Sequence, residues 1–176
     1  MVNYIHPTAI LNHPYNMGDN IEIMEFVVIG AVPLTFDGFK RIKPKFGIDM
    51  WNNIFVGTHS RIMKGSIRDT LIKNNVIIGQ NSNVGHDSII HNNVRIMNNV
   101  AIDGFSEIGK WSVLGTAVKV RNRKKIGENS LIGMASNVIS DIPDNVIAYG
   151  NPCKVIGAND GILKDLVKRF LLWYLK

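Results

Sequence analysis

Residues 72–90 read IKNNVIIGQNSNVGHDSII, and every sixth residue of this stretch is Ile or Val. The same step continues to residue 138 without a break. Twelve successive hexads therefore share one aliphatic position: Ile72, Ile78, Val84, Ile90, Ile96, Ile102, Ile108, Leu114, Val120, Ile126, Ile132 and Val138. A shorter run with the same step lies near the N-terminus, at Ile5, Leu11, Met17, Ile23 and Ile29. A fixed period of this kind indicates a repeat architecture.

Two other positions of the hexad are restricted as well. From Ile78 to Val138, the residue two positions before the aliphatic is Lys124 in one hexad and Val or Ser in the other ten. These ten are Val76, Ser82, Ser88, Val94, Val100, Ser106, Ser112, Val118, Ser130 and Ser136. Gly directly follows the aliphatic at residues 79, 85, 109, 115, 127 and 133. The chain also has 20 Asn, several of them in pairs. Gly and Asn both favour sharp turns, so we expect one of them to supply the turn in each hexad.

These restrictions predict an all-β fold, a parallel β-helix made of short flat strands. Residues i and i−2 of a strand point to the same side, so the aliphatic and the small residue would both face inward. Three strands with their turns would close a triangular coil of three hexads, and coils would stack about 4.8 Å apart. An amphipathic helix is excluded, because a period of six does not match 3.6 residues per turn. The period alone does not fix the handedness of the coil.

Two segments interrupt the period before residue 72, and a third follows its end. Residues 31–47 contain two prolines and four basic residues, which predicts a loop extruded from the coil. Residues 63–71 shift the frame more briefly. Residues 161–176 have the pattern of an amphipathic helix that covers the open end of the last coil, or alternatively lies on a membrane. We therefore expect a β-helix domain over residues 1–157 and a C-terminal helix within 158–176.

Composition narrows the functional classes. The chain has 176 residues, a single cysteine and no stretch that is long and apolar enough to span a bilayer, and its start does not resemble a signal peptide. We therefore expect a cytoplasmic protein. The formal charge of +6 favours anionic partners such as phosphates or nucleotides. A nucleic-acid-binding function would rest on this charge alone, because the sequence contains no known motif for recognising DNA or RNA bases.

The most specific segments are Val84-Gly85-His86-Asp87 and the ending IPDNVIAYGNPCKVIG at residues 142–157. With the hexads, they resemble the hexapeptide-repeat acyltransferases, which form a left-handed parallel β-helix and assemble as trimers. The ending resembles that of CoA-dependent acetyltransferases, including bacterial sugar-nucleotide N-acetyltransferases. The middle is similar to the UDP-N-acetylglucosamine O-acyltransferase of lipid A synthesis. The resemblance covers about residues 1–157.

The resemblance assigns roles to three residues. His86 matches the general base of these families, and histidine suits this role because its ordinary pKa is near 6.5. Asp87 would orient the ring, although adjacency in sequence does not guarantee contact. Gly104 occupies the position of His86 three hexads later, and so lies one coil above it. It matches the glycine whose N–H binds the oxyanion in the lipid A enzyme.

The same column and its neighbours suggest a donor site. Asn122, three hexads further along, could contact the pantetheine arm of acetyl-CoA. Basic residues near it could neutralise the CoA phosphates: Lys119, Arg121, Arg123, Lys124 and Lys125, together with Lys154. The extruded loop, with its basic residues and Phe36 and Phe39, could contact an acceptor or a neighbouring subunit.

The resemblance implies a homotrimer with its site between subunits and a sugar or nucleotide-linked sugar as acceptor. N-acylation and O-acylation both remain open. The lipid A enzyme has a multi-helix C-terminal domain, whereas only a short segment follows the coil here. This difference, with the Asn151-Pro152 ending, favours acetyl-CoA over an acyl-carrier protein as the donor.

Two other functions compete with acyl transfer. His86 and His91 have the spacing of the γ-class carbonic anhydrases, and His59 could supply a third zinc ligand. The residues after His91 do not resemble that family, so we expect no metal site. A non-catalytic assembly protein is also possible for a solenoid, but the His86-Asp87 pair at a corner favours an enzyme.

Overall fold

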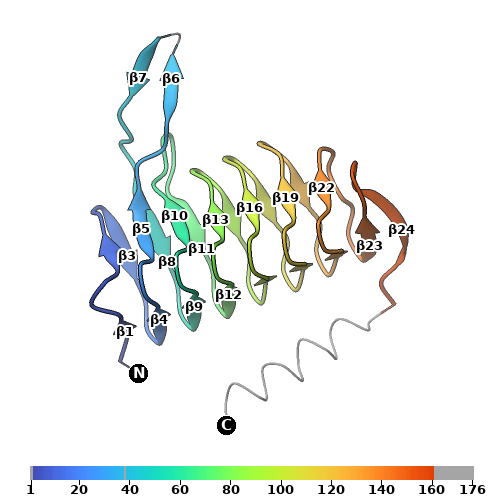
Figure 1. Cartoon of the computed structure of the whole chain (residues 1–176), viewed down its shortest axis with the longest axis horizontal. Helices are drawn as coiled ribbons and strands as arrows, with labels where there is room; N and C mark the ends of the chain where they lie inside the picture. The colour runs from blue at the N-terminus through green and yellow to red at the C-terminus, as the bar shows by residue number, and fades with distance from the viewer. Residues whose placement is uncertain (1, 38, 161–176) are drawn as a thin grey trace.

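The structure, a computed structural model, describes residues 2–37 and 39–160, which form a stack of three-sided coils built from short strands (Figure 1). Each side of the stack is a sheet of parallel strands, apart from one terminal strand. The first face contains, in order, β1 (Tyr4–Ile5), β4 (Ile21–Ile23), β9 (Ile54–Val56), β12 (Val76–Ile78), β15 (Arg95–Ile96), β18 (Val113–Leu114), β21 (Leu131–Ile132), β23 (Val146–Tyr149) and β24 (Lys154–Ala158).

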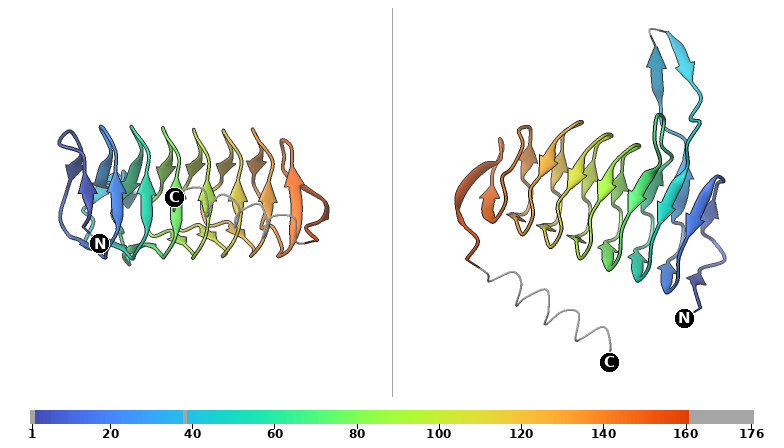
Figure 2. Two further views of the ribbon diagram at one scale, coloured as in Figure 1. Left: turned by 90° about the horizontal axis from the view of Figure 1, so that it is seen from below. Right: turned by 180° about the vertical axis from the view of Figure 1, so that it is seen from behind.

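The other two faces alternate with the first along the chain. The second face contains β2 (Ile10–Leu11), β5 (Val28–Ala31), β10 (Arg61–Met63), β13 (Asn83–Val84), β16 (Ala101–Ile102), β19 (Lys119–Val120) and β22 (Asn137–Val138). The third face contains β3 (Tyr15–Met17), β8 (Ile48–Met50), β11 (Thr70–Ile72), β14 (Ile89–Ile90), β17 (Glu107–Ile108) and β20 (Lys125–Ile126). The views in Figure 2 show the coils as successive rungs along one axis.

The hexad residues form the core, as predicted. All twelve aliphatic residues from Ile72 to Val138 are at most 1% exposed. The small residues two positions earlier are also buried, and the serines among them satisfy their hydroxyls on backbone groups, as Ser112 does on the Gly127 carbonyl. Lys124, the one exception in the sequence, is partly exposed and its ammonium lies 3.7 Å from Asp141.

Strand pairing gives the coil length directly. Asn83 pairs with Ala101 and Ala101 with Lys119, so each of these coils contains three hexads, as predicted. Below them Arg61 pairs with Asn83, which makes that coil four residues longer. The additional residues lie between β10 and β11, within the segment where the sequence shifts its frame. One corner of this coil is therefore larger than the corresponding corners above it.

The corners differ from the prediction in one respect. The glycines that follow the aliphatic residues are not in the left-handed region; a Cβ on Gly85, for example, would lie 2.5 Å from the Gly104 nitrogen of the next coil. These glycines permit close stacking. The left-handed residue lies two positions later and is most often Asn, but Phe105 and Arg123 also adopt this conformation. Stacked asparagines join the coils at the corner after the third face. The side-chain amides of successive residues are hydrogen-bonded to one another along the series Asn20, Asn53, Asn75 and Asn93.

Residues 31–47 leave the coil as predicted. They include an antiparallel hairpin of β6 (Thr35–Asp37) and β7 (Lys40–Ile42), which projects from one corner (Figures 1 and 2). At the other end, β24 pairs antiparallel with β23, an addition that the sequence did not predict. The helix expected at residues 161–176 lies outside the described residues. No helix in the described residues could span a bilayer.

Candidate active site

His86 and Asp87 lie at the corner between the second and third faces, which we call the His86 corner (residues 85–88, 103–106 and 121–124). The His86 Nδ1 is 2.6 Å from the Asp87 Oδ2. The Asp87 side chain is fully buried, whereas that of His86 is 15% exposed. The adjacency in sequence therefore does become a contact in space.

The ionisation of Asp87 determines the tautomer of His86. Burial would by itself raise the pKa of the Asp87 carboxyl, but hydrogen bonds from Ser66, Ile67 and His86 outweigh it and lower the pKa to about 2. An ionised carboxylate can only accept hydrogen bonds, so the Nδ1 of neutral His86 must donate. The lone pair of the ring is then on Nε2.

A loop from the coil below holds the Asp87 carboxylate. The backbone N–H groups of Ser66, Ile67 and Arg68 donate to it at 2.8 to 3.1 Å, and the Ser66 hydroxyl donates to Oδ2 at 2.5 Å. These donors come from the enlarged corner of the longer coil.

The backbone of Asp87 is fixed by the same segment. Its N–H donates to the Thr70 Oγ1 at 2.8 Å, and its carbonyl accepts from the Arg68 Nε and Nη2 at 3.0 and 2.8 Å. Asp87 is in the left-handed region, with a φ of 60°. Short polar residues tolerate this region better than most, and here the contacts on both sides of the residue maintain it.

Gly104 lies against the imidazole of His86. A Cβ built on Gly104 would be 2.7 Å from the His86 Nε2 and 2.8 Å from Cε1. Any larger residue would therefore displace the ring. Within the described residues, no hydrogen bond engages the Gly104 N–H.

Two side chains stack above His86 along the corner. The ring of Phe105 meets the imidazole edge-on, with centroids 5.0 Å apart, and the guanidinium carbon of Arg123 lies 4.7 Å from the Phe105 centroid. Phe105 thus forms an apolar wall for the imidazole, and Arg123 places a positive charge one coil further up.

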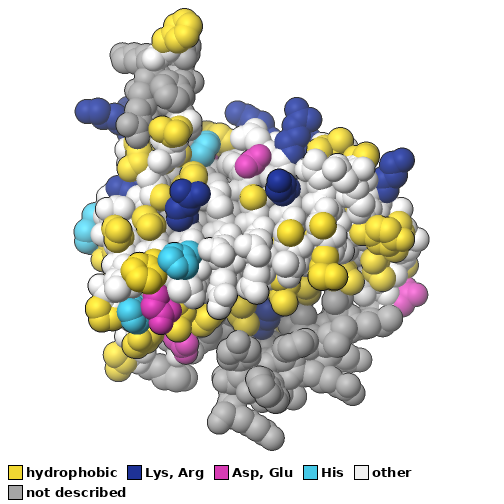
Figure 3. Space-filling model, viewed as in Figure 1, with side chains coloured by type: hydrophobic (Ala, Val, Ile, Leu, Met, Phe, Trp, Pro, Cys, Tyr) yellow, Lys and Arg dark blue, Asp and Glu magenta, His cyan; other side chains and the backbone are white. Residues whose placement is uncertain are grey.

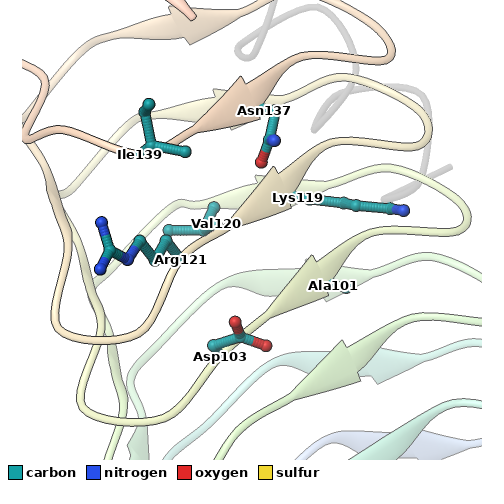
Figure 4. Close-up of a pocket in the computed structure, with 7 residues that line it drawn as sticks. All are labelled: Ala101, Asp103, Lys119, Val120, Arg121, Asn137 and Ile139. Atoms are coloured by element: carbon teal, nitrogen blue, oxygen red, sulfur yellow. The ribbon is translucent and has the colours of Figure 1, made fainter. Parts of the chain in front are cut away.

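A surface hollow of about 310 Å³ begins one coil above His86 on the second face. It is lined by Ala101, Asp103, Lys119, Val120, Arg121, Asn137 and Ile139 (Figure 4). Asp103 precedes Gly104, so the hollow adjoins the His86 corner. Lys119 and Arg121 extend toward opposite ends of it in Figure 4. A phosphorylated ligand would therefore meet a positive charge at either end.

The predicted donor-binding residues differ in whether their side chains are free to contact a ligand. Asn122, Arg121 and Arg123 are exposed, and basic side chains follow the edge of the stack on the side of the hairpin (Figure 3). Lys124 pairs with Asp141, and the Lys125 ammonium lies 3.7 Å from Glu107. Lys154 is exposed on β24, away from the His86 corner.

The three histidines of the alternative zinc site, His59, His86 and His91, lie at three different corners of the triangular coil. His59 stacks on Phe26 at a centroid distance of 5.0 Å. Both ring nitrogens of His91 have partners, Nδ1 with Lys73 Nζ at 3.2 Å and Nε2 with Glu107 Oε1 at 2.9 Å. In the described part of the chain, no group of three or more His, Cys, Asp or Glu side chains is arranged to hold a metal ion.

Sequence reasoning missed the residues that hold Asp87. Ser66, Arg68 and Thr70 belong to the coil below it and contact it through both side chain and backbone. Their signal was the frame shift at residues 63–71, which marked the enlarged corner without revealing its contacts. Phe105 was also missed, because an aromatic residue at a corner has no motif of its own.

Comparison with known proteins identifies similar chains, although no family model matches. The chain is 31% identical over 166 residues to an acyl-[acyl-carrier-protein]–UDP-N-acetylglucosamine O-acyltransferase of Nautilia profundicola, covering 88% of this chain and 58% of that protein. A shorter match, 61% identical over 31 residues, is to a galactoside O-acetyltransferase of Lactococcus lactis, covering 18% of this chain and 15% of that protein. The chain spans less than two thirds of the length of these curated relatives.

Solved structures share the fold. A UDP-N-acetylglucosamine acyltransferase from Bacteroides fragilis superposes with a TM-score of 0.82 at 21% identity, covering 99% of this chain and 72% of that one. The acetyltransferase domain of PglB from Neisseria gonorrhoeae, in complex with acetyl coenzyme A, gives a TM-score of 0.54 at 22% identity, covering 88% and 57%. The coil is thus the left-handed parallel β-helix that the resemblance implied, and the chain is similar in sequence and fold to acyltransferases and acetyltransferases built on hexapeptide repeats.

Proposed function

We propose that this chain transfers an acyl group, with acetyl-CoA as the donor, to an amino or hydroxyl group of a sugar or nucleotide-linked sugar. The observation that carries the proposal is the His86–Asp87 pair, with the unprotonated Nε2 of the ring beside a glycine at the end of a hollow. The relatives act by name on UDP-N-acetylglucosamine and on a galactoside, which supports a sugar acceptor.

The geometry suggests how the proton moves. Nδ1–H stays bonded to Asp87, and Nε2 takes the proton from the acceptor N–H or O–H as that atom attacks the thioester carbonyl. Asp87 stabilises the positive imidazolium that results. When the tetrahedral intermediate collapses, the C–S bond breaks and the CoA thiolate receives the proton from Nε2.

The oxyanion of that intermediate requires a donor. The Gly104 N–H is one strand spacing from His86 and is not used by another described group, so we assign it this role. Gly104 is buried against the imidazole in the single chain. The role therefore requires the carbonyl oxygen to approach along the edge of the ring.

The donor would lie in the hollow on the second face. Its pantetheine arm would run from Gly104 towards Asn122 and Asn137, with Lys119, Arg121 and Arg123 near its phosphates. A fold neighbour binds acetyl coenzyme A, which supports this type of donor. Lys124, Lys125 and Lys154 are less suited, because two are paired with acids and the third is distant.

We further propose that the active species is a homotrimer in which a neighbouring copy completes the site, so that an isolated monomer would be inactive. Sedimentation analysis of the protein, with activity measured on the separated species, tests this. A fully active monomer would contradict it.

The experiment that tests the function has two steps. Acetyl-CoA and longer acyl-CoAs are first screened for thermal stabilisation, because a ligand that binds only the folded state raises Tm. The best donor is then combined with a panel of amino-sugar nucleotides and galactosides while thiol release is followed. His86→Ala should lower turnover by about 10²- to 10⁴-fold while the protein stays folded. Turnover close to wild type in this variant would remove His86 from the mechanism.

A further inference from the structure

The enlarged coil corner has a specific structural consequence at the His86 corner. From Ile62 to Ile72 the chain advances four residues more than from Val84 to Ile90, the positions in register with them in the next coil. The additional length lets residues 66–68 present three successive N–H groups to one carboxylate. Successive N–H groups arranged in this way form a compact anion-binding concavity, and here the anion is the side chain of Asp87.

The two carboxylate oxygens accept three contacts each, but from different sets of donors. Oδ1 accepts from Ser66 N, Ile67 N and Arg68 N at 3.1, 2.8 and 2.9 Å. Oδ2 accepts from Ser66 N and Oγ at 2.9 and 2.5 Å and from His86 Nδ1 at 2.6 Å. Since Oδ1 is fully occupied, the loop fixes both the plane of the carboxylate and the oxygen that faces the imidazole.

We infer that the loop of residues 64–69 is a positioning element of the proposed catalytic pair and that Ser66 is its main positioning residue. Ser66 contributes two of the three bonds on Oδ2 besides its N–H on Oδ1, and its hydroxyl is also 3.4 Å from the His86 Nδ1. The inference rests on the proposed role of His86. It adds that the orientation and tautomer of the base depend on a segment one coil below.

The loop is itself held in place. The Gly47 carbonyl, at the foot of the extruded hairpin, accepts from Gly65 N and Thr70 N at 3.0 and 3.1 Å, and the Gly47 N–H donates to Asp69 Oδ1 at 2.7 Å. A Cβ on Gly65 would overlap the Arg68 carbonyl oxygen, so the turn accepts only glycine there. Asp87 is therefore held by a braced loop that joins the hairpin to the His86 corner.

Removal of the Ser66 hydroxyl should change two properties of the pair. One charge-assisted hydrogen bond to Oδ2 is lost, so the pKa of Asp87 should rise above its value of about 2. Oδ2 is then left with the Ser66 N–H and His86 Nδ1 alone, so its position relative to the imidazole is held less tightly and the preference of His86 for the Nδ1–H tautomer weakens. We expect Ser66→Ala to lower kcat by about 10- to 100-fold with little change in KM, and Ser66→Thr to retain most of the activity.

The test uses the full chain labelled with ¹⁵N-histidine and ¹³C-aspartate, with His86 and Asp87 assigned from single variants. The tautomer of His86 at neutral pH and the titration of Asp87 are compared in wild type, Ser66→Ala, Ser66→Thr and Ser112→Ala. Ser112 is a matched control, because it is a buried serine with a 2.7 Å hydroxyl bond at another corner. We expect changes in Ser66→Ala alone, and Gly65→Ala provides a second disruption of the loop.

The outcomes separate this inference from the proposed function. An unchanged tautomer and an unchanged Asp87 titration in both Ser66→Ala and Gly65→Ala would overturn the positioning role, whatever the activity. A shifted tautomer with no turnover of any acceptor in the panel would support the positioning role and count against the proposed reaction.

Discussion

Gly104→Ala should separate catalysis from stability. The added Cβ would lie 2.7 Å from the His86 Nε2, whereas ordinary contacts begin at 3.4 Å. The imidazole must therefore move by about 0.7 Å, and the nitrogen that moves is the proposed base. Gly104 is outside the left-handed region, so alanine introduces no backbone strain of its own.

The size of the effect follows from this displacement. A shift of about 1 Å in a reacting group costs about 100-fold in rate, so about 0.7 Å should lower kcat by about 10- to 100-fold. The stability cost should be small, since the ring of a side chain moves and no backbone does. Gly85→Ala should cost stability as well as activity, because its Cβ would meet the backbone nitrogen of Gly104 at 2.5 Å and force the coils apart.

The assay measures kcat and KM for both substrates together with the urea midpoint of each variant. Gly157→Ala is the control, because a Cβ there meets nothing within 4 Å and should leave both quantities unchanged. Wild-type kcat in a folded Gly104→Ala protein would refute the argument that the base must lie over a glycine.

Three further predictions concern charge and stability. Asp87 has a lowered pKa in the folded chain, so its ionisation stabilises the fold above about pH 4, and this stabilisation is lost as the pH falls towards 2. Between pH 6 and pH 3, the free energy of unfolding from urea denaturation should therefore fall by about 1 kcal/mol more in wild type than in Asp87→Asn. Arg121→Ala should raise the KM for the donor about 5- to 20-fold and weaken its salt dependence, whereas the paired Lys125→Ala should have little effect in the same kinetics. Asn75→Ala should lower the free energy of unfolding, measured by urea denaturation, by about 1 to 2 kcal/mol, because it removes the hydrogen bonds to Asn53 and Asn93 and places alanine in the left-handed region. Asn75→Gly should lower it less, because glycine adopts that region without strain.

The sequence predicted the coil because one inward aliphatic residue recurs in every hexad. Ile78, Val84 and Ile90 each occupy one side of a triangle, and the equal spacing fixes both the strands and their stacking. The column of His86 and Gly104 followed from the same arithmetic, since their coils have the standard length. The resemblance supplied the roles of the proposed base and of the glycine, and the hexad spacing placed the two side by side without coordinates.

The contacts of Asp87 could not be predicted in the same way. They join residues of a coil that is four residues longer, and the frame shift at residues 63–71 marks the enlarged corner without showing which groups it presents to the next coil. The left-handed conformation of Phe105 and Arg123 was equally hidden, because the stacked coils impose it against the local preference of these residues.

The enlarged corner suggests how this type of coil changes its site while it keeps its core. Ile62 and Ile72, on the two sides of the additional residues, are both fully buried and in register with the coil above. Residues added at a corner therefore leave the inward positions unchanged, and their backbone N–H groups become available to the next coil. In this chain those groups hold Asp87. The stability of a solenoid comes from contacts between adjacent coils, so a corner can acquire such a loop at little cost to the hydrophobic interior.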